Sequence, residues 1–134
     1  MTLIEWDNNL YSVNIEKFDN DHKKLLQFIN DLHQAMMQGQ GKAKLSNILD
    51  ELLDYTRYHF SAEEAEMQKA NYPELENHKK LHKELTDQLH QLIEDYKAGK
   101  KEVSIDTFRF LKEWLFNHIQ VVDKKYEPWL KANS

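Results

Sequence analysis

The sequence predicts an all-α fold, an up-down-up-down antiparallel four-helix bundle with an N-terminal arm packed across it. First, the 134 residues include only three Gly and two Pro, and these few breakers divide the chain into segments of helical length. Second, each segment repeats its apolar residues at the three- and four-residue spacing of an amphipathic helix. Third, the connections between the segments are short, which favours antiparallel neighbours.

The chain is expected to form one domain, residues 1–134, that begins with an arm over about residues 1–18. The arm carries apolar side chains, among them Trp6, Val13 and Phe18. This number of apolar side chains indicates that the arm packs against the helices and is not a free terminus.

The helices follow, each placed by its leucine spacing and bounded by a breaker. Gly39 and Gly41 separate the first helix from the second. Pro73 separates the second helix from the third, and Gly99 separates the third from the fourth. The expected helices cover about residues 19–38, 42–69, 74–97 and 104–130, with a break or π-turn near 118–123.

Composition argues against several classes of protein. The 18 basic and 23 acidic side chains, with a net charge of −5, are interspersed, which argues against a nucleic-acid or anionic-membrane surface. The absence of Cys excludes disulfides, thiolate nucleophiles and Cys-based metal sites. No segment approaches the roughly 20 apolar residues of a membrane span, and from the first residues we expect no signal peptide. We expect a cytoplasmic monomer with no nucleic-acid or membrane partner.

Polar side chains interrupt the apolar stripe of every predicted helix. An unpartnered buried polar group costs several kcal/mol. The summed cost of burying all these side chains without partners would therefore exceed the roughly 5–15 kcal/mol net stability of a domain. A hydrogen-bonded network is one way to compensate them, but metal ions held by imidazole and carboxylate are the simpler one. The residues are His22 on the first helix, His59 and Glu63 on the second, His78 and His82 on the third, and His118 on the fourth.

Spacing supports a metal site. His59 and Glu63 are four residues apart, as are His78 and His82, so each pair presents two ligand atoms from one helix face. Asp123 follows His118 by five residues, which is about 140° around a regular helix. We therefore expect a π-turn or a helix end between His118 and Asp123.

The types of ligand atom limit which metal ions could bind. Five imidazoles exceed one tetrahedral zinc site, the helical zinc-protease motif is absent, and no His follows a Glu by three residues as in ferritin-like bundles. Nitrogen and oxygen donors without sulfur admit iron, manganese, copper or zinc.

These motifs resemble those of the hemerythrin family, in its bacterial single-domain form. The matching pattern is His22, then His59-Phe60-Ser61-Ala62-Glu63, then His78-x-x-x-His82, then His118-x-x-x-x-Asp123. The resemblance covers essentially the whole chain and matches all seven ligand positions of the family. It extends to Trp6, Phe18-Asp19-x-Asp21-His22, Tyr72-Pro73 and Trp114-Leu115.

The resemblance implies two iron ions, cycling between Fe2+ and Fe3+, with an oxo or hydroxo bridge. His78, His82 and His118 would bind one iron and His22 and His59 the other, with Glu63 and Asp123 bridging both. By the resemblance, one coordination position would stay open, on the iron with two histidines, and O2 would enter there. The matched residues that would line the O2 pocket, each also an ordinary core residue, are Phe60, Trp114, Leu115 and Ile119.

The function that follows is reversible O2 binding for oxygen carriage, storage or delivery to an oxygen-consuming enzyme. One alternative is a di-iron oxidase or peroxidase, and another is a module that senses O2 or nitric oxide. The last alternative is a structural bundle without metal. We expect no enzyme, because no acid or base other than the ligands is evident beside the site. A sensor would need an output domain, for which residues 1–134 leave no room.

Among the residues outside this pattern, Glu64 and Glu66 are expected on the charged surface, His33 at the edge of the apolar stripe of its helix and His90 in solvent.

Overall fold

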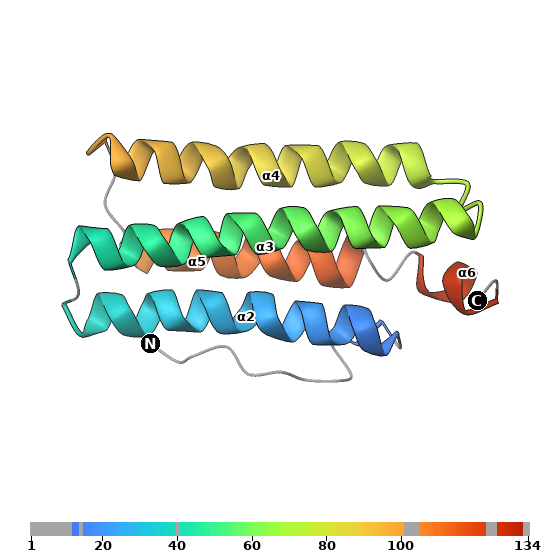
Figure 1. Cartoon of the computed structure of the whole chain (residues 1–134), viewed down its shortest axis with the longest axis horizontal. Coiled ribbons are helices and arrows are strands. Elements are labelled where there is room, and N and C mark those ends of the chain that lie inside the picture. Colours follow the sequence, from blue (N-terminus) through green and yellow to red (C-terminus); the bar gives the residue numbers. More distant parts are fainter. Residues whose placement is uncertain (1–11, 14, 40, 101–104, 123–125, 133–134) are drawn as a thin grey trace.

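The computed structural model describes residues 12–13, 15–39, 41–100, 105–122 and 126–132, and these residues form a bundle of α-helices (Figure 1). In Figure 1 the directions of the four long helices alternate along the chain, as the up-down-up-down prediction requires. Helix α3 packs against α2 and α4, and α5 packs against α2. The elements are α2 (Glu16–Met37), α3 (Lys42–Lys69), α4 (Leu75–Lys97), α5 (Ile105–Phe116), the π-helix η1 (Asn117–Val122) and α6 (Glu127–Ala132).

Helix α2 begins at Glu16, earlier than the sequence predicts, so Phe18 belongs to the helix and not to the arm. The side chain of Asp19 explains the start, because it accepts hydrogen bonds from the backbone N–H of Val13 at 2.8 Å and from Ser12 Oγ at 2.6 Å. These bonds fold the preceding chain back over the first turn. Residues 1–11 and 14 lie outside the described residues, so packing of the whole arm stays a prediction.

Three of the helices are followed by a residue with a positive backbone φ angle. Gly39 has φ +70° after α2 and Gly99 has φ +77° after α4, a conformation that glycine adopts without steric cost. Asn71, with φ 54°, takes this conformation after α3. The backbone N–H of Tyr72 then reaches back to the carbonyl of Met67 at 2.9 Å. This turn redirects the chain into α4.

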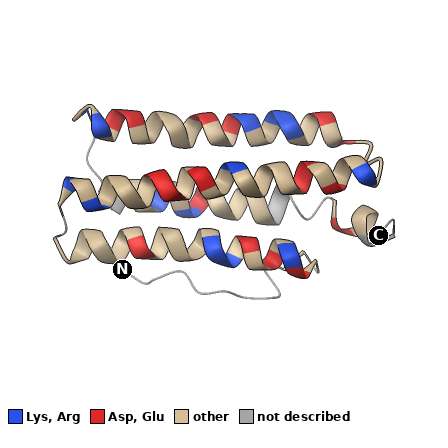
Figure 2. Cartoon of the chain, viewed as in Figure 1, with Lys and Arg blue, Asp and Glu red and all other residues tan. Residues whose placement is uncertain are grey.

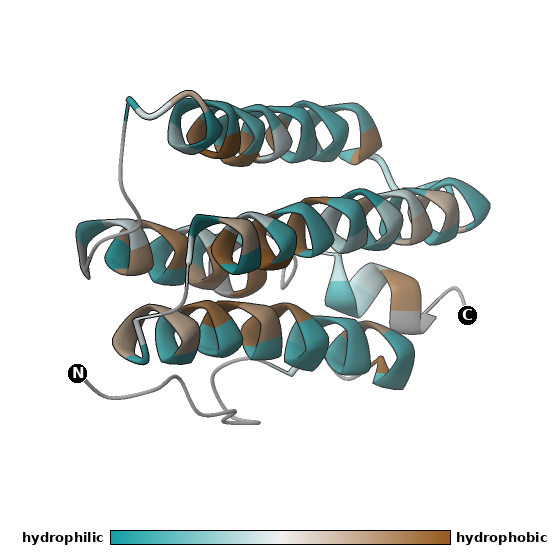
Figure 3. Cartoon of the chain, turned by 60° about the vertical axis from the view of Figure 1, so that its left-hand side comes forward, coloured by the Kyte–Doolittle hydropathy of each residue, from teal (hydrophilic) through white to brown (hydrophobic). Residues whose placement is uncertain are grey.

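The long helices are amphipathic. Figure 3 shows hydrophobic residues along one side of each long helix and hydrophilic residues along the other. Among the described residues, Lys and Arg alternate with Asp and Glu along the outer faces (Figure 2). None of the described helices is long and apolar enough to cross a membrane.

The core consists of two apolar clusters. The larger cluster fills most of the bundle, from Leu45 and Tyr96 toward Phe60 and Ile119. The smaller cluster lies near the other end and combines both ends of the described chain with the α3–α4 turn. Its buried members are Val13, Phe18, Met67, Ala70, Tyr72, Tyr126 and Leu130.

Replacing a leucine in the larger cluster should strongly destabilise the protein. Leu49 is fully buried, and a Leu→Ala change at such a site costs about 2–5 kcal/mol because it removes apolar contacts and leaves a cavity. We expect Leu49→Ala to lower the free energy of unfolding by this amount in urea titrations followed by circular dichroism. Leu81→Ala is the matched control: Leu81 is 37% exposed, and the change should cost less than about 1 kcal/mol. Equal losses in the two variants would contradict this description of the core.

Candidate metal centre

A layer of polar side chains separates the two apolar clusters. On α2 it falls between Phe18 and Leu25, and on α3 between Leu53 and Met67. The layer is enclosed by apolar side chains toward both ends of the bundle. All its members are buried, and they are His22 from α2, His59 and Glu63 from α3, His78 and His82 from α4, and His118 from η1.

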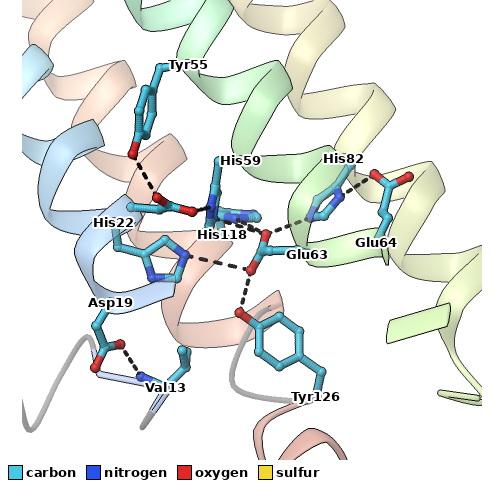
Figure 4. Close-up of polar contacts among 11 residues, drawn as sticks. Val13, Asp19, His22, Tyr55, His59, Glu63, Glu64, His82, His118 and Tyr126 are labelled. Atoms are coloured by element: carbon cyan, nitrogen blue, oxygen red, sulfur yellow. Dashed lines mark hydrogen bonds and ion pairs between the residues drawn. The ribbon is translucent and has the colours of Figure 1, made fainter. Parts of the chain in front are cut away.

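Glu63 lies at the centre of this layer (Figure 4). Its Oε1 atom is 3.2 Å from His59 Nε2, 3.4 Å from His82 Nε2 and 3.3 Å from His118 Nε2. Its Oε2 atom is 3.8 Å from His22 Nε2 and accepts a hydrogen bond from the Tyr126 hydroxyl. The side chain therefore has one oxygen near histidines from α3, α4 and η1 and the other near the histidine of α2.

The donor atoms form two groups that share Glu63. One group is His22, His59, Glu63 and His118, and the other is Glu63, His78 and His82; within each group the candidate ligand atoms lie within 4.8 Å of one another. Glu63 Oε1 and His82 Nε2 are buried without a hydrogen-bond partner among the described residues. A cation in each group would satisfy these atoms and offset the cost of burying them. The residues therefore fit two first-row metal ions joined by Glu63.

His118 lies between the two groups. By donor distance it falls with His22 and His59, whereas the family pattern places it with His78 and His82. Its ring centre is nevertheless 5.2 Å from that of His82 and 5.8 Å from that of His22. The division of the histidines between the two ions stays a prediction.

The π-helix η1 lies where the spacing of His118 and Asp123 led us to expect a wider turn. A π-helix pairs residues five apart, so it favours bringing residues 118 and 123 to one face. Asp123 itself lies outside the described residues, and its part in the centre stays a prediction.

Burial and hydrogen bonding act in opposite directions on Glu63 and Asp21, the two buried carboxylates of the described residues. Burial raises the pKa of Glu63, but the electrostatic effect of His59 and close contacts with His118 and His82 outweigh it and hold that pKa well below its usual range. Burial likewise raises the pKa of Asp21, and its hydrogen bonds with His59 and Tyr55 lower it to below its ordinary value. Both groups are therefore carboxylates at neutral pH.

Three further side chains contact the candidate ligands and were missed in the sequence. Asp21 pairs with His59, Glu64 pairs with His82, and Tyr126 donates to Glu63. The surface position expected for Glu64 is wrong, because its carboxylate is half-buried and 2.8 Å from His82 Nδ1. Spacing along one helix carries no signal for these contacts, since each one joins different segments of the chain.

The remaining histidines lie apart from the centre. His33 is buried, with its ring centre 4.5 Å from that of Phe108. It follows His22 by eleven residues on α2, roughly 16 Å along the helix axis. His90 is exposed, with Nε2 3.3 Å from Glu94, so the solvent position expected for it is confirmed.

Apolar side chains enclose the polar layer on the side of the larger cluster. The Phe60 ring stacks on that of His82, with centres 3.9 Å apart and planes 4° from parallel, and it lies 4.6 Å from the His118 ring. The Trp114 indole N–H donates to the Leu85 carbonyl at 3.0 Å, which fixes its ring. The four side chains expected to line an O2 pocket are all buried: Phe60, Trp114, Leu115 and Ile119.

Known proteins are similar to this chain in sequence and in fold. A family model described as the hemerythrin HHE cation binding domain matches residues 13–130. The chain is 38% identical over 132 residues to a bacteriohemerythrin of Methylococcus capsulatus, covering 98% of this chain and 100% of that protein. It is 32% identical over 123 residues to a myohemerythrin of Theromyzon tessulatum, with 92% and 90% covered. A crystal structure of wild-type hemerythrin matches with a TM-score of 0.89 at 37% identity, covering 96% of this chain and 98% of the other.

Proposed function

The chain belongs to the hemerythrin family and binds O2 at a non-haem di-iron centre, and we propose that this binding is reversible and serves oxygen carriage, storage or delivery. The observation that carries the proposal is the enclosed polar layer, in which imidazoles from four elements surround one carboxylate between two apolar clusters. The proposed iron ligands are His22, His59, Glu63, His78, His82, His118 and Asp123.

Each part of the chain has a distinct task in this proposal. When bound, the two irons supply the electrons that O2 takes up. Glu63 would join the two ions, since its two oxygens face different sets of histidines. Phe60 packs beside His82 and His118, and Trp114 lies next to Phe60 with ring centres 6.5 Å apart, so that these side chains keep water from that side of the centre. Exclusion of water suppresses proton transfer and loss of reduced oxygen, which is what reversibility requires.

We favour binding over catalysis because of the groups next to the ligands. Asp21 and Glu64 are each hydrogen bonded to a candidate ligand histidine, and Tyr126 donates to Glu63. A general acid or base must be available to exchange a proton with the substrate. These side chains instead support the ligands. A cytoplasmic location, a monomeric state and an oxygen-consuming partner stay predictions.

Metal analysis combined with visible spectroscopy tests the proposal. We expect about two irons per chain, as the two donor groups require, and a visible band that forms under O2 and disappears under vacuum through repeated cycles. The control is the same protein after iron is removed with a chelator, which should show no such band. Steady turnover of peroxide or another substrate, faster than autoxidation, would instead favour a di-iron enzyme.

A further inference from the structure

We propose that Asp21, held in place by Tyr55, is a positioning residue that fixes the tautomer of His59 and tightens the hold on the ion bound by His22 and His59. The inference rests on the proposed function, since it assigns a task to side chains around the same centre. It also gives the two ions unequal surroundings.

The geometry around Asp21 carries the inference. Its Oδ2 atom is 2.9 Å from His59 Nδ1, and its Oδ1 atom accepts a hydrogen bond from the Tyr55 hydroxyl at 2.7 Å. Asp21 is buried and its side chain is only 9% exposed. Both carboxylate oxygens therefore have a protein partner, and the carboxylate is held between α2 and α3.

This contact determines which nitrogen of His59 is available to a metal. A carboxylate only accepts hydrogen bonds, so His59 Nδ1 carries the proton that faces Asp21. The other nitrogen, Nε2, keeps its lone pair and points to the centre, 3.2 Å from Glu63 Oε1. A carboxylate on the outer nitrogen orients the ring of a metal-binding histidine and raises its basicity. Asp21 thus prepares His59 as a ligand.

Tyr55 holds Asp21 in turn. The Tyr55 ring lies beside two other aromatic rings, with centres 5.7 Å from that of Phe28 and 5.5 Å from that of Tyr58. These contacts restrict the ring, so the hydroxyl stays directed at the carboxylate. The chain of contacts runs from Tyr55 through Asp21 to His59 and then to the centre (Figure 4).

The other side of the centre is supported less completely. His82 Nδ1 faces Glu64 at 2.8 Å, but the Glu64 side chain is 26% exposed. Among the described residues no second side chain hydrogen bonds to Glu64. Water therefore competes for this carboxylate, whereas Asp21 is enclosed. The better-supported histidine belongs to the pair on which the resemblance places the open coordination position.

Iron release from the loaded protein tests the inference. Ferrous protein is mixed with a strong chelator, and the loss of each iron is followed by absorbance. Outer partners of metal-binding histidines are worth about 10–100-fold in metal affinity, so we expect Asp21→Asn to speed the loss of one iron by this factor and leave the other unchanged. Tyr55→Phe should speed the same phase by only about 2- to 10-fold, the worth of one hydrogen bond.

Two comparisons separate positioning from a general loss of stability. Because Tyr55 acts through Asp21, Tyr55→Phe should have no further effect in the Asp21→Asn background. Glu64→Gln is the matched control, and it should speed the other phase, so that only the double variant Asp21→Asn, Glu64→Gln releases both irons quickly. A second readout is solvent exchange of the His59 Nδ1–H proton, detected by NMR of the ferrous protein, which should be faster in Asp21→Asn than in Glu64→Gln.

The possible failures are distinguishable. If the unaltered chain binds two irons and O2 but Asp21→Asn releases both irons at the original rates, this inference is wrong and the proposed function stands. Equal acceleration of both phases by Asp21→Asn alone would also overturn it. If the unaltered chain takes up no iron, the proposed function fails.

Discussion

Removing iron should lower the melting temperature of the protein by roughly 10–20 °C. The polar layer places five imidazoles and Glu63 in the interior, and metal binding contributes directly to folding where it compensates such groups. A decrease of about 4 kcal/mol in the free energy of unfolding is modest for such a site. It corresponds to a shift of this size in the melting temperature of a chain of this length. Circular dichroism melts of the loaded and the chelator-treated protein measure the shift.

The difference should grow as the solution becomes acidic. The pKa values of Glu63 and Asp21 lie below their ordinary values of 4.5 and 3.8, so the stability these carboxylates contribute is present above those values. It is lost as the pH falls through the lower values that apply in the folded protein. Reloading with Fe2+ at neutral pH is the control and should restore the original melt; an iron-free protein that melts at the loaded temperature would contradict our description of the core.

Glu63→Gln should abolish the centre while leaving the bundle folded. The amide keeps the size of the side chain but lacks the charge and the second oxygen donor, and among the described residues Glu63 alone is shared by the two donor groups. We expect at least about 100-fold weaker iron binding, beyond the upper end of the range for outer partners, and no band that responds to O2. Iron content and visible spectra under O2 and vacuum give the result.

The same variant should behave differently without iron. The surroundings of Glu63 lower its pKa and so favour the ionised side chain in the folded protein, and a neutral amide loses that stabilisation. The iron-free Glu63→Gln protein should therefore unfold at a lower urea concentration than the iron-free original. Glu64→Gln is the control, because it removes a charge from the next residue and should still permit binding of two irons. If Glu63→Gln retained two irons and reversible O2 binding, Glu63 would not join the ions.

The sequence predicted those parts of the molecule that depend on helical period. Apolar spacing places Leu25 and Leu49 in the core, and the same spacing places His22, His59 and Glu63 on inward faces. A buried imidazole in register with leucines is visible in a single helix because its position follows from the residues of that helix alone.

What the sequence did not predict depends on contacts between helices. Tyr55 and Asp21 are 34 residues apart, and Glu64 and His82 are 18 apart. Their meeting is determined by how each helix rotates about its axis, which periodicity does not specify. Glu64 directly follows Glu63, which faces inward, and its position predicted a surface charge. Its carboxylate nevertheless contacts His82 on α4. The early start of α2 likewise depends on a hydrogen bond from the Val13 backbone N–H to the Asp19 side chain, which composition does not reveal.

The smaller apolar cluster has a practical consequence for handling the molecule. It is assembled from Val13, Phe18, Tyr126 and Leu130, near the two termini, together with the α3–α4 turn. Opening it requires only local fraying, which takes far less free energy than melting the whole domain. Because this cluster encloses one side of the polar layer, we expect its opening to admit water to the centre and to speed the loss of bound iron. Affinity tags and fusion partners should be joined through linkers long enough to leave both ends undisturbed.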